Sequence, residues 1–269
     1  MRLLKKYLYS DMDHTVIASD KTVSERNQQA LRLFTSLGGR FGVATGRNVA
    51  IARPYLKYLP VNSPSIVYNG AAVYDFNAGK FLHRLLFPAA LGEEIMNLAI
   101  ATYPQGSAQA FSEGPILLLN PNSVTDHYIL EENQPHASAS VKEGCAHAFK
   151  VQMYGEHERL LEVQAAVEER LHGEGYLCTF SAPYYLEYLP LGASKGGALR
   201  WIEENLGQSR EETAAVGDFF NDLEMLEMAS VGAAVANAPE EVRRRADMVV
   251  AGCDHHALED FILHHLIEE

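Results

Sequence analysis

Acidic residues occur in two short segments whose spacing would allow them to share one chemical task. Asp11 and Asp13 are separated by a single residue, and Asp218 and Asp222 lie in the segment Gly-Asp-Phe-Phe-Asn-Asp. Two like charges about 4 Å apart repel by roughly 4 kcal/mol at an effective dielectric constant of 20. Carboxylates that meet in a fold are therefore protonated or neutralised by a cation. Mg²⁺ accepts carboxylate oxygens and keeps coordination sites for water and phosphate, so these segments predict a metal site if they meet.

Two further segments would add a hydroxyl group and positive charge. They are Thr45-Gly46-Arg47 and Lys195, which lies in Ser-Lys-Gly-Gly. With a metal ion, Lys195 would make a locally positive pocket that suits a small phosphate dianion, although the formal net charge of the chain is -13. Each segment alone also fits a purely structural role, because Asp favours turns, Thr and Asp cap helices, and a lysine at a helix start is often solvated. Their presence in one chain favours a common site.

These polar residues follow apolar runs that are typical of strands. The runs that precede Asp11, Thr45 and Asp218 cover residues 7–9, 41–44 and 213–216. A helix is expected over residues 24–37, with Ser24 as its N-cap, and alternating strands and helices predict a parallel sheet. Further strands are expected over residues 65–68, 231–235 and 248–250. Because open parallel sheets bind ligands at the carboxyl ends of their strands, the polar segments are expected to meet there.

The middle of the chain has a different pattern, typical of an α+β insert. Helices are expected over residues 88–103 and 156–172, and strands over 115–119, 147–154, 176–180 and 184–188. The aromatic strand at 184–188 is expected to pack in the core of the insert or to act as a hinge, rather than to form a ligand surface. The prediction is an α/β fold with a Rossmann-like parallel-sheet core, formed by residues 1–85 and 187–269, and an inserted α+β domain over residues 86–186.

Four motifs in order along the chain resemble those of the haloacid dehalogenase superfamily. The family pattern Asp-x-Asp-x-Thr is matched by residues 11–15, and its Thr followed by Gly-Arg by residues 45–47. Its lysine is matched by Lys195, and its Gly-Asp-x-x-Asn-Asp by residues 217–222. The match is closest to the Cof-type phosphatases, in which a C2B-type cap domain is inserted between the second and third motifs. The resemblance covers nearly the whole chain.

The resemblance implies a role for each matched residue. Asp11 would attack phosphorus and form an aspartyl-phosphate, and Asp13 would act first as general acid and then as general base. Mg²⁺ would be held by the carboxylates of Asp11 and Asp218 and by the main-chain carbonyl of Asp13. Asp222 would support the metal shell and orient the lysine. The phosphoryl oxygens would be bound by Thr45, Gly46, Lys195 and Asn221.

Three further residues are candidates for substrate contact, namely Arg47, Asn69 and His14. Arg47 is either a substrate ligand or a partner in a structural ion pair, and Asn69-Gly70 is a turn in either interpretation. His14 stands where the family usually has glycine, which permits backbone angles that other residues avoid. The histidine is either a bystander or a residue that influences Asp13 or touches the substrate.

Composition restricts the partners and the cellular location. The chain has 22 Lys and Arg against 35 Asp and Glu, which disfavours nucleic-acid binding. No apolar run approaches the roughly 20 residues of a membrane span, and the amino terminus lacks the apolar region of a signal peptide. A cytoplasmic protein without a membrane partner is therefore expected. The three cysteines are far apart, which favours free thiols over disulfides or a zinc site.

The expected activity is Mg²⁺-dependent hydrolysis of a small phosphorylated metabolite, such as a sugar phosphate or a similar phosphomonoester. A phosphomutase would use the same aspartyl-phosphate and return the phosphate to its substrate. A non-catalytic binding protein of the same fold would be expected to lack Asp11, Asp13 or Lys195, all of which are present. The sequence gives no indication of the oligomeric state.

Overall fold

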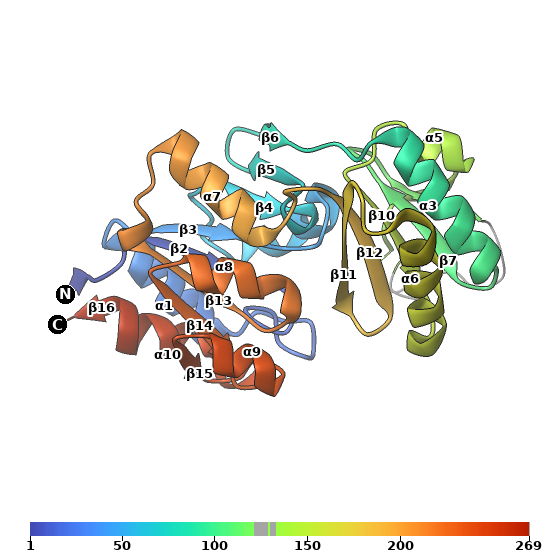
Figure 1. Cartoon of the computed structure of the whole chain (residues 1–269). Helices are drawn as coiled ribbons and strands as arrows, with labels where there is room; N and C mark the ends of the chain where they lie inside the picture. The colour runs from blue at the N-terminus through green and yellow to red at the C-terminus, as the bar shows by residue number, and fades with distance from the viewer. Residues whose placement is uncertain (121–128, 130–132, 269) are drawn as a thin grey trace. The chain divides into compact units, whose positions relative to one another are not determined.

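The computed structural model describes residues 1–120, 129 and 133–268, which divide into two compact units (Figure 1). Unit 1 comprises Met1–His83 and Ser194–Glu269, and unit 2 comprises Arg84–Ala193. Each unit has its own cluster of buried apolar side chains. Unit 2 is therefore an insertion into the chain of unit 1.

The centre of unit 1 is a five-stranded parallel sheet with the strand order β15-β14-β13-β2-β3. Its strands are β2 (Tyr7–Ser10), β3 (Arg40–Val43), β13 (Thr213–Gly217), β14 (Val231–Val235) and β15 (Met248–Val250). A separate antiparallel sheet contains β4 (Ser65–Val67), β5 (Ala72–Asp75) and β6 (Lys80–Arg84). The chain ends pair through β1 (Arg2–Leu3) and β16 (Ile267–Glu268), so that the two termini lie side by side (Figure 1).

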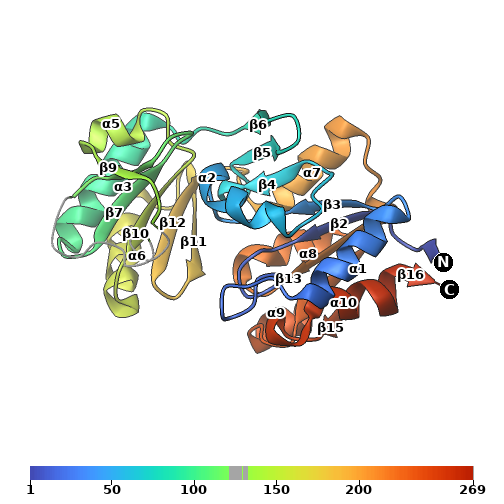
Figure 2. The same cartoon turned by 180° about the vertical axis from the view of Figure 1, so that it is seen from behind.

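Helices cover both faces of the parallel sheet. They are α1 (Glu25–Ser36), α2 (Val49–Ala52), α7 (Lys195–Leu206), α8 (Leu223–Met228), α9 (Glu240–Arg245) and α10 (Ala257–Phe261). Short 3₁₀ turns cover Arg53–Lys57, Tyr68–Gly70, Arg210–Glu212, Phe220–Asp222 and Cys253–His255, and a π-helical segment covers Ile262–Leu266. Figures 1 and 2 show α7 and α8 on one face and α1 and α10 on the other. The helix expected after Ser24 is confirmed, because the Ser24 side chain accepts a hydrogen bond from the Asn27 amide.

The order of the strands creates a switch point next to β2. From β2 the chain moves outward to β3 on one side, whereas β13, β14 and β15 extend the sheet on the other side. The loops that follow β2 and β13 therefore leave the same edge of the sheet and diverge. Such a point is where open α/β sheets bind their ligands.

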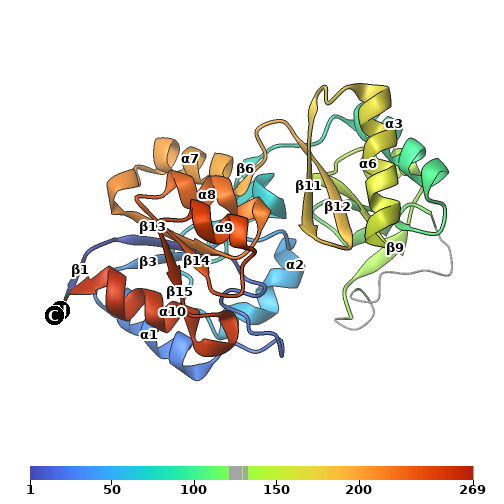
Figure 3. The ribbon, with the colours of Figure 1, turned by 60° about the horizontal axis from the view of Figure 1, so that its bottom comes forward.

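Unit 2 is a six-stranded, mostly antiparallel sheet with the order β11-β12-β10-β7-β8-β9. Its strands are β7 (Ser107–Phe111), β8 (Ile116–Leu118), β9 (His136–Ser138), β10 (Lys150–Tyr154), β11 (Tyr176–Ala182) and β12 (Tyr185–Pro190). Its helices are α3 (Ala89–Thr102), α5 (Val141–Cys145) and α6 (His157–Leu171). Figure 3 shows α3 and α6 together on one face of this sheet. Leu186 and Tyr188 of β12 belong to the apolar core between sheet and helices, so the aromatic strand serves packing as expected.

The second boundary between the units lies later than the position expected from the sequence. The expected boundary was near residue 186, but β12 continues to Pro190 and pairs with β10 and β11. Unit 2 therefore extends to Ala193. The strands β7 and β9 and the helix α5 were not expected from the sequence.

None of the helices among the described residues has both the length and the apolar character needed to cross a membrane.

Candidate active site

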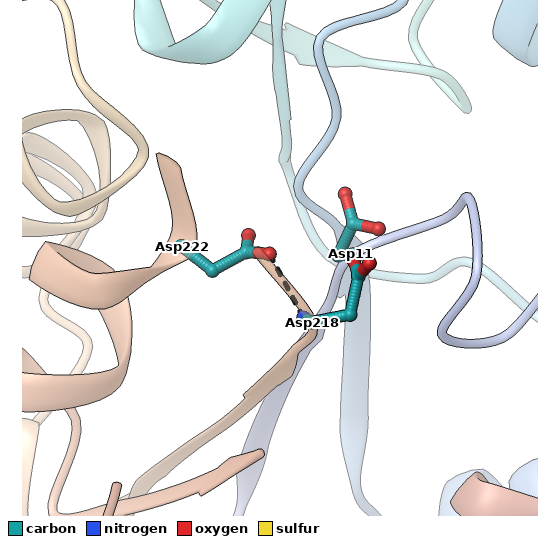
Figure 4. A group of neighbouring side chains, drawn as sticks. All are labelled: Asp11, Asp218 and Asp222. Carbon is teal, nitrogen blue, oxygen red and sulfur yellow. Dashed lines mark hydrogen bonds between the residues drawn. The ribbon is translucent and has the colours of Figure 1, made fainter. Parts of the chain in front are cut away.

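Asp11 and Asp218 follow neighbouring strands of the parallel sheet. Strand β2 pairs with β13 up to Ser10 and Val216, and the Asp11 amide then donates to the Val216 carbonyl at 2.9 Å. Asp222 lies in the 3₁₀ turn that follows β13. One carboxylate oxygen from each of these three residues lies within 4.8 Å of the other two (Figure 4). The switch point of the sheet thus collects three carboxylates.

Lys195 places a single ammonium group among these carboxylates. Its side chain is 1% exposed, and Nζ donates to Asp11 Oδ1 at 2.5 Å and to Asp222 Oδ1 at 2.6 Å. Lys195 is the first residue of α7, and the Ser194 side chain caps that helix by accepting from the Gly197 amide. Burial opposes charge on Lys195, but the two carboxylates outweigh it and raise the pKa of the lysine. The ammonium group is therefore held in its charged form.

The Asp222 carboxylate also holds the loop that carries Asp218. Its Oδ2 accepts from the amides of Asp218 at 3.0 Å and Phe219 at 3.1 Å, and the first of these bonds is drawn in Figure 4. The approach requires a glycine before Asp218, because a Cβ atom on Gly217 would lie 2.5 Å from Asp222 Cγ. Both Asp222 oxygens are thus engaged, one by the loop and one by Lys195.

Negative charge exceeds positive charge in this cluster. Burial raises the pKa of Asp11 to about 7, with Lys195 opposing the rise and the Asp222 and Asp13 carboxylates adding to it. Burial and the Asp11 charge raise the pKa of Asp218 well above its usual range. The Asp218 carboxylate also accepts a hydrogen bond from Thr15 Oγ1 at 3.3 Å. An all-oxygen donor set with surplus negative charge fits a hard divalent cation.

Asp13 belongs to a different ion pair from that of Asp11. Arg47 Nε donates to one Asp13 oxygen at 2.8 Å, and its Nη2 donates to the other at 2.7 Å. The guanidinium group also lies over the Tyr55 ring, 4.9 Å from the ring centroid. Burial works against ionisation of Asp13, but the hydrogen bonds and charge of Arg47 outweigh it and lower the pKa of this carboxyl. Two carboxyl groups only two residues apart therefore have pKa values shifted in opposite directions.

Thr45 follows β3 and is almost fully buried. Its side-chain oxygen accepts from the Arg47 amide at 3.1 Å, which shapes the turn that leads to the guanidinium group. The Thr45 carbonyl accepts from the Asn69 amide at 3.0 Å, and the Asn69 side chain lies against Gly46. The turn at residues 45–47 is thus anchored to the 3₁₀ turn at Tyr68–Gly70.

The Asn69 and Asn221 side chains pair with each other. Asn221 Nδ2 donates to Asn69 Oδ1 at 2.9 Å, which joins the turn after β4 to the turn after β13. Asn69 adopts a φ of 53°, and Gly70 adopts a φ of 92°. A Cβ atom on Gly70 would lie 2.0 Å from the Ser194 carbonyl oxygen, so only glycine permits this approach to the start of α7. The turn therefore lies directly beside the residue that precedes Lys195.

His14 takes the backbone conformation that glycine would adopt easily. Its φ is 56°, and its carbonyl accepts from Asn237 Nδ2 at 2.9 Å. The Asn237 side chain also accepts from the Cys253 amide at 2.8 Å, so one asparagine supports the strained turn. The His14 side chain is exposed. The substitution of glycine by histidine is therefore accommodated by the loop after β14.

Three residues in this region were given no role from the sequence. They are Thr15, which contacts Asp218, Asn237, which supports His14, and Tyr55, which packs on Arg47. Thr15 completes the Asp-x-Asp-x-Thr motif, which is a signal in the sequence. Tyr55 lies in a 3₁₀ turn after Arg47, and no local pattern marks it.

The fold and the site together define a class of protein. A parallel α/β sheet with carboxylates and a buried lysine at its switch point is typical of an enzyme that acts on an anionic substrate with a divalent cation.

Comparison with known proteins identifies the family. The family model for haloacid dehalogenase-like hydrolases matches residues 8–262. The chain therefore belongs to the haloacid dehalogenase-like hydrolase family.

Relatives along the whole chain agree with this assignment. The chain is 29% identical over 267 residues to the HMP-PP phosphatase of Serratia proteamaculans, with 95% of this chain and 93% of the relative covered. It is 27% identical over 270 residues to the pyridoxal phosphate phosphatase YbhA of Escherichia coli, with 96% and 97% covered. A haloacid dehalogenase-like hydrolase from B. subtilis has a similar structure, with a TM-score of 0.84, 26% identity, and 97% and 100% of the two chains covered.

Proposed function

We propose that this chain is a Mg²⁺-dependent phosphatase that hydrolyses a small phosphomonoester through an aspartyl-phosphate on Asp11. The observation that carries the proposal is the position of the Asp11 carboxylate at the switch point of the sheet. It is buried there against the Lys195 ammonium group and beside two further carboxylates. Only an anionic substrate accompanied by a cation suits such a site, and relatives along the whole chain bear the names of phosphatases.

In the first half of the reaction, an Asp11 oxygen forms a bond to phosphorus as the bond from phosphorus to the ester oxygen breaks. Asp13 supplies the proton that the leaving alkoxide takes up. In the second half, Asp13 takes a proton from a water molecule whose oxygen attacks phosphorus. The bond from phosphorus to Asp11 then breaks and inorganic phosphate leaves.

Arg47 governs which form of Asp13 is present. The bidentate ion pair holds Asp13 ionised, which is the form required for the second half of the reaction. For the first half, Asp13 must carry a proton, so the ion pair must open. A substrate phosphate that attracts the Arg47 guanidinium group would open it, which gives Arg47 a substrate-side role.

The phosphoryl oxygens would be bound by groups from three segments, namely the turn at residues 45–47, the start of α7 and the turn after β13. We assign this role to Thr45, Gly46, Lys195 and Asn221, with Asn69 holding the Asn221 amide. His14 is assigned to the substrate side because its side chain is exposed and it follows Asp13 directly. Phosphoryl transfer needs alignment and charge neutralisation above all, and these groups supply both.

The donor set fits a resident Mg²⁺ ion. Asp11 and Asp218 would hold it with the main-chain carbonyl of Asp13, and Asp222 would support this set through its bonds to Lys195 and the Asp218 amide. When bound, the ion supplies positive charge that offsets the charge of the phosphoryl group. Unit 2 would act as the cap that excludes water and selects the leaving group.

The test is release of inorganic phosphate from a panel of sugar phosphates, pyridoxal 5′-phosphate and p-nitrophenyl phosphate. Release in Mg²⁺ that stops in EDTA, and that Asp11→Asn abolishes, is the expected result. The asparagine variant keeps the shape of the side chain but lacks a nucleophilic carboxylate. If phosphate moves to another position of the substrate without release, the enzyme is a mutase. If Asp11→Asn retains substantial turnover, the assigned nucleophile is wrong.

A further inference from the structure

Two adjacent phenylalanines, Phe219 and Phe220, follow the candidate metal ligand Asp218 in the loop after β13. Their rings meet edge to face, with the centroids 5.1 Å apart and an angle of 77° between the ring planes. Phe220 is 42% exposed, and Phe219 is half-buried. Neither ring is a member of an apolar core in the described part of the chain. Core packing therefore does not account for this aromatic pair.

The chain on either side holds the pair next to the candidate active site. Asp218 and Asp222, which are drawn in Figure 4, flank the short loop that contains both rings. The Phe219 amide donates to Asp222 Oδ2 at 3.1 Å, and the side chain of Asn221 donates to a second turn of the site. Consecutive Cα atoms lie about 3.8 Å apart, so Phe220 begins one such step from Asn221. Its exposed ring is therefore within reach of a group bound beside Asn221.

The other loops at this edge of the sheet also carry rings. His14 follows Asp13 in the loop after β2, and its side chain is exposed. Tyr55 comes after β3 and packs under the Arg47 guanidinium group. An exposed apolar surface beside a polar site is typical of a ligand-binding surface. Aromatic side chains offer packing to a planar ring, whereas phenylalanine offers no hydrogen-bond partner to the hydroxyl groups of a sugar.

We infer that the Phe219–Phe220 pair selects the leaving group, so that the preferred substrate is a phosphomonoester whose alcohol carries a planar aromatic or heteroaromatic ring. The inference rests on the proposed function, because it concerns the part of the substrate that leaves when phosphate is transferred. The ring of the leaving group packs on Phe220 while the phosphate lies against Lys195 and Asn221. A sugar phosphate places hydroxyl groups against the same rings and leaves them without partners. Phe220 is thus a specificity-determining residue.

Three phosphomonoesters of primary alcohols test the selection on native protein in Mg²⁺. Benzyl phosphate has a planar ring, cyclohexylmethyl phosphate has an apolar ring of similar size that is not planar, and glucose 6-phosphate presents hydroxyl groups. All three leaving groups need a proton, so differences in kcat/KM report on contacts with the leaving group. We expect kcat/KM for benzyl phosphate to exceed that for glucose 6-phosphate by about tenfold or more, and that for cyclohexylmethyl phosphate by about threefold or more. If benzyl phosphate has no advantage over either compound, the inference is overturned and the phosphatase proposal remains.

Variants locate the preference at Phe220. In Phe220→Ala, the ratio of kcat/KM for benzyl phosphate to that for glucose 6-phosphate is expected to fall by about fivefold or more, and Phe220→Tyr, which keeps the ring, should retain most of it. Leu206→Ala is the matched control, because Leu206 is 40% exposed and ends α7, at the opposite end from Lys195. Its ratio should equal that of native protein. A ratio compares two substrates on one sample, so partial unfolding does not alter it. An unchanged ratio in Phe220→Ala overturns the inference.

Binding of phosphonates tests the same contact without turnover. 2-Phenylethylphosphonate has a methylene group in place of the ester oxygen of benzyl phosphate, so it is not hydrolysed. Calorimetric titration of native protein in Mg²⁺ is expected to show that it binds about threefold or more tightly than 2-cyclohexylethylphosphonate. If the two phosphonates bind equally while phosphate esters are hydrolysed, the inference is wrong and the proposed function stands. If the preference is present but no ester is hydrolysed, the proposed function is wrong and the ring contact stands.

Discussion

Replacing Lys195 by methionine removes the one ammonium group that contacts both Asp11 and Asp222 among the described residues. With Nζ at 2.5 Å and 2.6 Å from the two oxygens, the gross attractions are about 7 and 6 kcal/mol at an effective dielectric constant of 20. Most of this attraction offsets the desolvation of the buried charges. Breaking a buried ion pair by removing one partner costs about 3–5 kcal/mol, because the remaining charge is left uncompensated. We expect Lys195→Met to lose this amount of unfolding free energy in EDTA.

Magnesium is expected to restore part of the lost stability. A ligand that binds the native state alone stabilises it by about 1.4 kcal/mol at ten times its dissociation constant. The variant lacks a positive charge beside the carboxylates, so Mg²⁺ should stabilise it more than it stabilises native protein. Urea unfolding in EDTA and in Mg²⁺ measures both effects. Trp201, the single tryptophan of the chain, lies in α7 and reports on unit 1 by fluorescence.

Lys150→Met is the matched control. Lys150 is also buried, at 3% exposed, and its Nζ contacts Glu187 Oε1 at 2.9 Å in the sheet of unit 2. The same substitution there should cause a comparable loss, measured by far-ultraviolet circular dichroism, and that loss should not respond to Mg²⁺. The reasoning is refuted if Lys195→Met loses less than about 1 kcal/mol in EDTA. It is also refuted if Mg²⁺ stabilises both lysine variants equally.

Three further predictions follow from the pairing of Asp13 and from the packing at Gly217. The Asp13 carboxyl has a pKa below its unfolded value, so its ion pair contributes stability above about pH 4 that is lost as the pH falls further. The deficit of Arg47→Met in urea unfolding should therefore be present at pH 7 and shrink at pH 3, and a deficit independent of pH would contradict the pairing. Asp13→Asn should slow hydrolysis of alkyl phosphates more than that of p-nitrophenyl phosphate, whose leaving group needs no proton, and equal losses would exclude Asp13 as the general acid. Gly217→Ala should lower stability by about 1–3 kcal/mol in thermal unfolding and reduce turnover, because the added methyl group meets Asp222, and an unchanged unfolding temperature would contradict the close approach.

The arrangement of the core was predictable because strong local signals coincide there. Apolar runs end at or one residue before the positions that precede Asp11, Thr45 and Asp218, and each run matches a strand of the parallel sheet to within one residue at either end. Parallel strands bring their carboxyl ends to one edge, so residues more than 180 positions apart meet without any local contact. The strands alone do not determine the positions of the side chains at that edge, which depend on the conformations of the loops that follow the strands.

Unit 2 was less predictable because two of its strands, β7 and β9, lack a distinctive composition. Strand β7 reads Ser-Ala-Gln-Ala-Phe, and alanine, serine and glutamine have little tendency to form strands. It forms a strand because β10 and β8 pair with it on either side. The end of unit 2 was also expected too early, since the strand predicted over residues 184–188 continues as β12 to Pro190.

The partners of the polar side chains were the least predictable feature. Arg47 could be read as a substrate ligand or an ion-pair residue, and only the fold shows its bidentate contact with Asp13. The contact between Asn69 and Asn221 likewise joins segments with no sequence signal in common. Side-chain pairing depends on distances of a few ångströms between distant segments, and periodicity carries no information at that scale.

The opposite pKa shifts of Asp11 and Asp13 have a consequence for the proposed reaction. Burial favours a protonated Asp11, whereas a nucleophile must be ionised, and Arg47 favours an ionised Asp13, whereas a general acid must be protonated. Asp11 is thus only partly ionised near neutral pH, and Asp13 is held in the form unsuited to the first step. A divalent cation beside Asp11 would lower its pKa, and a substrate phosphate that attracts Arg47 would allow the pKa of Asp13 to rise. Under the proposed function, the site becomes competent for the first step only when both cation and substrate are bound, which protects the nucleophile from reaction in their absence.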